Sequence, residues 1–219
     1  MARLIIFQRN EILSKFQKII RKVFGRYLFT QFFSYLNNKD VVSKKYYEIC
    51  NKEYLFIKDA LKGKKNILSI GGGMGGVESI ILSNNDNISL HLIEKNFISK
   101  KIKYFWNPKE GYNKLNLTKE FIISNSLKTT NFEIFNFENL DKIKKKYDLI
   151  FSFYSMDYHF DLNIYKKFFL KNSHAGTTYI FDSIRPEKLS KYFKYVKVLS
   201  KDKKKIHSSS RVMCSEILK

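Results

Sequence analysis

The stretch NILSIGGGMGGVESI, residues 66–80, decides the fold of this chain, because it places five glycines within six positions between two apolar runs. The apolar residues 66–70 are typical of a short buried strand, and the residues from Val77 onward are typical of the start of a helix. Glycine is entropically costly, and a plain connection would not need five of them. The stretch therefore predicts a strand, a ligand-binding turn and a helix, in that order.

The glycine spacing fits two cofactor classes. Gly71, Gly73 and Gly76 satisfy the dinucleotide pattern G-x-G-x-x-G, whereas Gly71, Gly73 and Gly75 satisfy G-x-G-x-G. Glu94 closes the next apolar segment, where its carboxylate can accept hydrogen bonds from both hydroxyls of a ribose. The motif alone leaves a dinucleotide and S-adenosylmethionine open. The rest of the chain disfavours a nicotinamide enzyme, because the segments after Glu94 leave no room for a separate substrate lobe.

The remaining sequence alternates between strand and helix patterns. Strands are expected at residues 66–70, 88–94, 131–137, 147–154 and 177–183, with helices between several of them. This alternation predicts an α/β fold with an open, mostly parallel sheet covered on both faces. Residues 194–200 and 208–218 are apolar and too close together for a crossover helix, so they predict an antiparallel hairpin at the C-terminal end.

The first 63 residues are expected to form an N-terminal helical extension, and residues 64–219 the sheet domain, as one unit overall. Residues 11–36 carry apolar residues at helical spacing with basic residues between them, as one helix or as two split near Gly25. We expect this apolar face to cover the sheet or a partner in a homodimer, in preference to docking on a membrane or closing over a substrate. A second helix is expected at residues 43–61.

Composition sets further bounds. The net charge is +21 at pH 7, with 41 Lys and Arg against 20 Asp and Glu. Lysine dominates and is spread along the chain, which favours a compositional bias over a nucleic-acid surface. Two cysteines, Cys50 and Cys214, cannot form a disulfide framework, and no apolar run of 18 residues occurs. A cytoplasmic protein without a transmembrane segment is expected.

Over residues 64–219 the chain resembles the class I S-adenosylmethionine-dependent methyltransferases. Four segments carry this resemblance: ILSIGGGMGG, LHLIEKN, YDLIFSFYS and RVMCSEIL. The resemblance implies a Rossmann-like doubly wound sheet of seven strands with the last one antiparallel, and S-adenosylmethionine as the cofactor. One position departs from the family, which often has an acid where this chain has Ser69. The cofactor-binding residues that it implies are Ser69, Gly71, Gly72, Gly73, Gly75, Glu94, Asn136, Phe137 and Phe153.

The segment after the fourth strand, SMDYHFDLNIY, together with KYFWNPKEGYNKLNL, is similar to bacterial sugar O-methyltransferases. An alcohol acceptor must lose its proton, so a base near neutral pKa is expected at the carboxyl edge of the sheet. His159 is the candidate base, with Asp157 close enough in sequence to orient it or raise its pKa. The alternative is that His159 only begins the next helix. Tyr154, Ser155 and Tyr158 are candidates for lining the same mouth.

The predicted function is therefore in-line methyl transfer to a hydroxyl of a small molecule or sugar. Three alternatives remain: a methyltransferase acting on RNA or another nucleic acid, an NAD-binding oxidoreductase, and a non-catalytic cofactor-binding protein. A nucleic-acid partner is the less favoured acceptor, because the segment after the fourth strand lacks the proline element of base N-methylation and the cysteine of C5-methylation. No metal is expected, since no Cys/His cluster occurs, although Asp157 and Asp182 could meet at the sheet edge.

Overall fold

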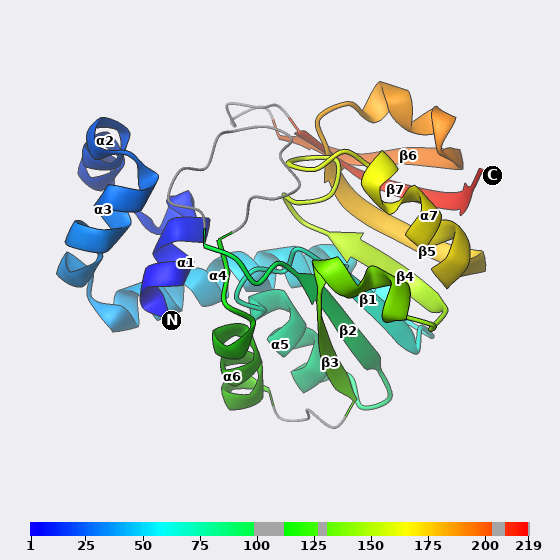
Figure 1. Ribbon diagram of the computed structural model, residues 1–219, viewed down its shortest axis with the longest axis horizontal. Helices are drawn as coiled ribbons and strands as arrows, with labels where there is room; N and C mark the ends of the chain where they lie inside the picture. The colour runs from blue at the N-terminus through cyan, green and yellow to red at the C-terminus, as the bar shows by residue number, and fades with distance from the viewer. Residues whose placement is uncertain (99–111, 127–130, 203–208, 219) are drawn as a thin grey trace.

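A seven-stranded sheet forms the centre of the computed structural model, which describes residues 1–98, 112–126, 131–202 and 209–218 (Figure 1). The strand order is β3-β2-β1-β4-β5-β7-β6. Strands β1 to β5 pair in parallel, and β7 lies antiparallel between β5 and β6. This confirms the predicted Rossmann-like sheet with its antiparallel hairpin strand. The strands are β1 Asn66–Ile70, β2 Ser89–Glu94, β3 Phe132–Asn136, β4 Tyr147–Ser152, β5 Ser173–Ser183, β6 Phe193–Asp202 and β7 Ser209–Ile217.

Helices cover both faces of this sheet (Figure 1). Successive residues of a strand point to opposite faces, so Ile67 packs in the core under α1, α4 and α5, whereas Leu68 packs in the core beside α7. The α-helices are α1 Ala2–Gln8, α2 Lys15–Phe24, α3 Arg26–Phe33, α4 Lys39–Ile57, α5 Gly76–Asn84, α6 Leu115–Asn125 and α7 Asn163–Asn172. The 3-10 helices are η1 Asn10–Ile12, η2 Ser34–Leu36, η3 Asp59–Leu61, η4 Phe137–Lys142 and η5 Pro186–Lys191.

The helix expected at residues 43–61 is α4, which brings side chains from the N-terminal region to the glycine turn. It begins one turn earlier than expected, because the Asn38 side chain accepts hydrogen bonds from the backbone amides of Asp40 and Val41 and caps the helix. Its buried face packs on α5 and includes Tyr46 and Glu53. The tyrosine hydroxyl accepts a hydrogen bond from the first amide of α5, on Gly76, at 3.2 Å.

The helical region at residues 11–36 is split at Gly25, as expected, but its apolar face does not cover the sheet. Phe16, Ile19 and Val23 of α2 are exposed, and the buried residue of this helix is Arg21. The Arg21 guanidinium donates to the backbone carbonyls of Ile6 and Phe7, both at 3.0 Å. A cation bound to the last carbonyls of α1 is favourable, and it fixes α2 with its polar side inward. The prediction that this face covers the sheet is therefore wrong.

Within the described ranges, no helix is both long enough and apolar enough to cross a membrane.

Candidate active site

The glycine turn follows the central strand β1, at the carboxyl edge of the sheet where open α/β folds bind their ligands. Gly71 and Gly73 have positive φ angles of 71° and 62°, a backbone conformation that other residues rarely adopt. A Cβ atom on Gly71 would lie 2.1 Å from the Oγ of Ser155, so the segment after β4 closely approaches the turn. The turn thus requires glycine both for its backbone angles and for the space around it.

Glu94, at the end of β2, lies directly beside this turn. Its two carboxylate oxygens accept hydrogen bonds from the backbone amides of Gly73 and Lys95, each at 2.8 Å. Burial raises the pKa of Glu94 to about 7, against the opposing effect of these two hydrogen bonds. Each oxygen keeps a further lone pair for a ligand hydroxyl. The role of Glu94 in binding a ribose stays a prediction.

Two residues that the sequence analysis missed hold the turn from its other side. Asn113 Nδ2 and Thr118 Oγ1 donate to the backbone carbonyl of Gly73 at 2.7 and 3.0 Å. Both side chains are buried. Asn113 lies in the segment KYFWNPKEGYNKLNL but was given no role there, and Thr118 lies in the first turn of α6, outside the segments singled out in the sequence, so only the fold brings them to the turn. Together with Glu94 they bind both the amide and the carbonyl of Gly73.

A buried acid lies next to Ser69 at the floor of the turn, although Ser69 stands where the family often has an acid. The carboxylate of Glu78, from the first turn of α5, is buried and hydrogen-bonded to the Ser69 hydroxyl. The other oxygen of Glu78, Oε2, is buried and has no hydrogen-bond partner in the described part of the chain. Burial raises the pKa of Glu78 to about 7. In this chain the acid next to position 69 therefore comes from α5 and not from β1.

A small cavity of about 10 Å³, the size of one water molecule, lies at this floor. Arg9 and Glu53, which both line this cavity, form a bidentate salt bridge with nitrogen-to-oxygen distances of 2.8 and 3.0 Å. The N-terminal region thus contributes side chains directly to the site, although the particular pair of Arg9 and Glu53 was not among the predicted site residues. The cavity is lined by Arg9, Glu53, Ser69, Gly71, Gly72, Val77, Glu78, Phe151 and Phe153.

Two further cofactor-binding residues that the resemblance implies lie at the end of β3: Asn136 is its last residue, and Phe137 follows it. Asn136 is the register partner of Glu94 in the β2–β3 pair. The Phe137 ring packs edge-on against Tyr165 with 5.6 Å between centroids, and the ammonium of Lys95 lies 5.0 Å from the Phe137 centroid. An aromatic ring and an amide thus lie near the strand-final acid, and their role in cofactor binding stays a prediction.

The segment after β4 has an unusual backbone. Tyr154 and Asp157 have φ angles of 59° and 55°, which are uncommon for residues with a side chain and are often found at functional sites. The Asp157 carboxylate accepts hydrogen bonds from Ser183 and from Arg185, the latter at 3.1 Å. Burial raises the pKa of Asp157. The described partners of its carboxylate are thus the last residue of β5 and a residue of the loop that follows, and its predicted role in orienting His159 stays a prediction.

His159 is connected to the mouth of the site through aromatic rings. Its backbone amide donates to the Ser155 carbonyl at 2.8 Å, and its ring packs edge-on against Tyr158 at 4.7 Å. Tyr158 in turn packs edge-on against Tyr154 at 5.5 Å. His159 therefore lies at the carboxyl edge after β4, where the sequence placed it.

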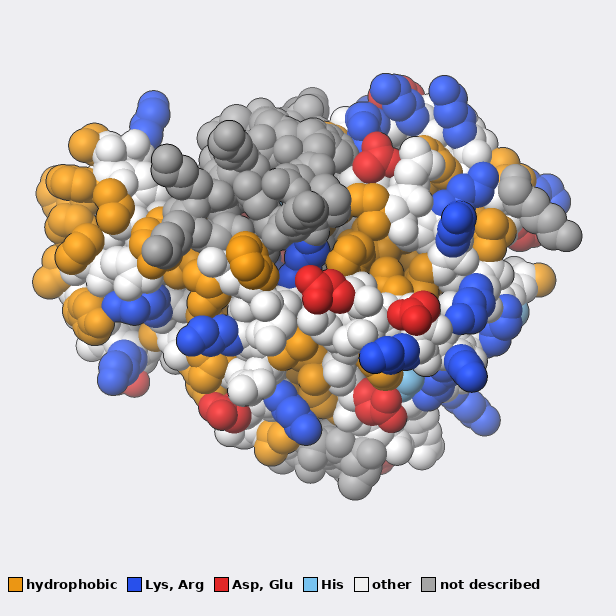
Figure 2. All heavy atoms as spheres, in the orientation of Figure 1, with side chains coloured by type: hydrophobic (Ala, Val, Ile, Leu, Met, Phe, Trp, Pro, Cys, Tyr) orange, Lys and Arg blue, Asp and Glu red, His pale blue; other side chains and the backbone are white. Residues whose placement is uncertain are grey.

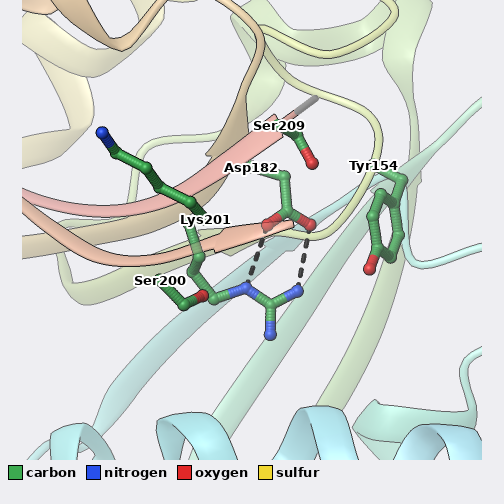
Figure 3. A pocket seen from close by; sticks show the side chains of 6 residues that line it. Tyr154, Asp182, Ser200, Lys201 and Ser209 are labelled. Atoms are coloured by element: carbon green, nitrogen blue, oxygen red, sulfur yellow. Dashed lines mark hydrogen bonds and ion pairs between the residues drawn. The ribbon is translucent and has the colours of Figure 1, made fainter. Parts of the chain in front are cut away.

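A cavity of about 270 Å³ opens at the same edge, between β4, β5 and the β6–β7 hairpin (Figure 3). The buried Asp182 carboxylate is bound there by Arg211, with both nitrogen-to-oxygen distances at 3.0 Å, and the guanidinium lies 4.0 Å from the Phe153 ring centroid. Figure 3 shows the Asp182 carboxylate in this ion pair and the Lys201 ammonium extending away from it. The cavity is lined by Tyr154, Asp182, Ser200, Lys201, Ser209 and Arg211.

The two aspartates considered for a hard cation are bound to different arginines. Asp157 pairs with Arg185 and Asp182 with Arg211. No group of three or more His, Cys, Asp or Glu side chains with metal-binding geometry occurs among the residues that the structure describes.

Three solved structures with the same fold are assigned as methyltransferases. A protein from Staphylococcus aureus, assigned as a caffeoyl-CoA O-methyltransferase, matches 93% of this chain and 100% of its own length at 13% identity, with a TM-score of 0.53. The methyltransferase domain of the bacterial protein CtHen1-CN matches 76% of this chain and 100% of its own at 14% identity, with a TM-score of 0.50. A protein from Nostoc punctiforme assigned as an O-methyltransferase matches 77% of this chain and 56% of its own at 10% identity, with a TM-score of 0.51.

The chain therefore has the fold of the class I S-adenosylmethionine-dependent methyltransferases. No protein-family model matches its sequence, and no curated protein does. At these identities the likeness establishes the fold, and the activity has to be argued from the site.

Proposed function

We propose that this chain is an S-adenosylmethionine-dependent methyltransferase that methylates a hydroxyl group of a small molecule or sugar. The observation that carries the proposal is the contact between Glu94 and the amide of Gly73, which places a half-buried acid beside a left-handed glycine turn at the end of β1. Such an acid can accept hydrogen bonds from ribose hydroxyls while the turn lets the ligand approach the backbone.

Glu78 distinguishes S-adenosylmethionine from a dinucleotide at this turn. When bound, S-adenosylmethionine supplies an electrophilic methyl group on a sulfonium, and its amino-acid part carries an ammonium. The unpartnered Oε2 of Glu78 can accept a hydrogen bond from that ammonium, and so supplies the acid that Ser69 lacks. For a pyrophosphate the same buried carboxylate would be a repulsive neighbour at the N-terminal end of α5.

The cavity at the β6–β7 hairpin is the candidate acceptor site. Its lining carries three hydroxyl groups, from Tyr154, Ser200 and Ser209, next to the Asp182–Arg211 ion pair. Hydroxyls and a fixed ion pair can bind the hydroxyls of a sugar through several directed hydrogen bonds. Burial raises the pKa of the Tyr154 phenol, so this group is a hydrogen-bond donor and not a base at neutral pH. The polar lining favours a hydroxylated acceptor.

Calorimetric titration tests the cofactor assignment. We expect S-adenosylmethionine and its demethylated product to bind, and NADH not to bind. Binding of NADH with no heat from either sulfur compound would overturn the proposal and favour an oxidoreductase.

His159 is proposed as the base that removes the acceptor proton. Replacing it with alanine should lower kcat by about a hundredfold, with little change in cofactor affinity, because a positioned base typically contributes this much. The pH profile of kcat should also lose its limb in the range where histidine titrates. His174, which is bonded to Asp148 away from the turn, gives the matched control variant His174→Ala. An unchanged kcat and pH profile in His159→Ala would remove this residue as the base.

A further inference from the structure

The surface of α2 and α3 presents the apolar side of an amphipathic helix to solvent. Phe16, Ile19 and Val23, at spacings of three and four on α2, are 71%, 62% and 75% exposed. Leu28 and Phe32, four apart on α3, are exposed as well. Figure 2 shows hydrophobic side chains gathered over the edge of the molecule where these helices lie in Figure 1. We call these five residues the apolar edge.

Contacts on the inner side of α2 hold the apolar edge outward. Besides the two bonds from Arg21 to the end of α1, the Gln17 side chain donates to Asn37 Oδ1 at 2.8 Å. The polar side chains of Gln17 and Arg21, together with Ile20, therefore occupy the face of α2 that packs on the protein. A helix that buries its arginine and exposes its phenylalanine is the reverse of an ordinary surface helix, and a large exposed apolar patch marks an interaction site.

The charges around the apolar edge are of one sign. Residues 12–39 contain no Asp or Glu. Lys15, Lys18 and Lys22 repeat the spacing of Phe16, Ile19 and Val23 one residue earlier, so a row of lysines runs along one side of the apolar row. The further basic residues of this range are Arg21, Arg26 and Lys39. A basic border beside an apolar stripe matches the headgroups and acyl chains of an anionic bilayer.

A second copy of the chain fits this surface less well. A two-fold symmetric contact would bring the lysine row of one copy toward that of the other, within a chain whose net charge is +21 at pH 7. Like charges across a contact are costly, and salt would strengthen such a dimer by screening them. An anionic bilayer has the opposite charge, and salt weakens that attraction.

We propose that the apolar edge docks this protein on an anionic membrane surface, with the apolar row in the interface and the lysine row on the headgroups. The inference stands apart from the proposed reaction, since it uses no residue of the candidate active site.

Cosedimentation with phosphatidylcholine vesicles, with and without phosphatidylserine, tests this inference on the full chain. We expect binding to the vesicles that contain phosphatidylserine, weakened by added salt. The triple variant Phe16→Ser, Ile19→Ser, Val23→Ser should bind at least about tenfold more weakly, because it removes the apolar row. Its matched control is Ile123→Ser, Leu170→Ser, which changes exposed apolar residues on α6 and α7 and should bind as the wild type does.

A variant of the lysine row distinguishes docking through this surface from a nonspecific attraction of the membrane to the protein's net positive charge. Lys15→Gln, Lys18→Gln, Lys22→Gln should weaken binding by roughly fivefold per lysine. The same change at Lys167, Lys188 and Lys191, which are exposed elsewhere, removes as much charge and should have a clearly smaller effect. Equal losses in both lysine variants, full binding by the serine triple variant, or no binding to anionic vesicles would each overturn the proposal. Dimerisation strengthened by salt, without vesicle binding, would assign the surface to a second copy.

Discussion

Glu94→Ala is expected to weaken binding of S-adenosylmethionine by about a hundredfold. The side chain sits beside the glycine turn with both oxygens bound to backbone amides and a lone pair left on each. Two hydrogen bonds from ribose hydroxyls to an ionised carboxylate contribute roughly 3 kcal/mol or more together, which corresponds to that loss. Isothermal calorimetry with the cofactor measures it directly.

The same substitution leaves the amide of Gly73 without its acceptor, so its effect on folding must be separated from its effect on binding. Glu94→Gln keeps one carbonyl oxygen for an amide and should lose less affinity than the alanine variant. Glu120→Ala, on the exposed side of α6, is the matched control and should bind as the wild type does. Wild-type affinity in a Glu94→Ala protein with an intact thermal transition would contradict the assigned role.

Glu78→Gln is expected to stabilise the protein above neutral pH and not below about pH 5. Burial raises the pKa of Glu78 in the folded chain to about 7, from an ordinary value of 4.5. The folded state therefore holds this proton more tightly than the unfolded state, and stability falls as pH rises from the lower value to the higher one. Glutamine does not titrate, so the free energy of unfolding of the variant should exceed that of the wild type by about 1–3 kcal/mol near pH 8.

Urea unfolding at about pH 5 and about pH 8 gives the difference, and Glu120→Gln should show none at either pH. Cofactor affinity provides a second readout. It should rise with pH through about 7 in the wild type, as Glu78 and Glu94 ionise, and Glu78→Gln should reduce that rise. If the variant and the wild type differ by the same free energy at both pH values, Glu78 does not titrate as the structure indicates.

Much of the sheet could be predicted from the sequence, because its cues are local. The glycine turn, the strand-final Glu94 and the closely spaced last two strands each depend on residues near one another in the chain. The same is true of the break at Gly25, whose φ of 79° ends α2. Local cues are therefore sufficient for the strands and the glycine turn, whereas they left open whether residues 11–36 form one helix or two.

The position of the Glu78 side chain at the floor of the turn could not be predicted from local cues. Glu78 lies within the motif but could be read only as an acid in the first turn of a helix, because nothing local shows that its side chain bends back to Ser69. The Arg9–Glu53 pair joins residues 44 positions apart, so it depends on how α1 and α4 pack. The predicted orientation of the apolar face of α2 was wrong for a similar reason. Helical spacing reveals an apolar face, but the bonds from Arg21 to α1 decide which way that face points.

The position of β7 has a consequence for the order in which the chain can fold during synthesis. Within the described sheet, β6 pairs with β7 and not with β5, so β6 leaves the ribosome before the strand that joins it to the sheet. Arg211 lies on β7, which is synthesised after β5 and β6. The ion pair between Arg211 and Asp182 of β5 can therefore form only once β7 has been made. The cavity at the hairpin should consequently form last, after the glycine turn is already in place.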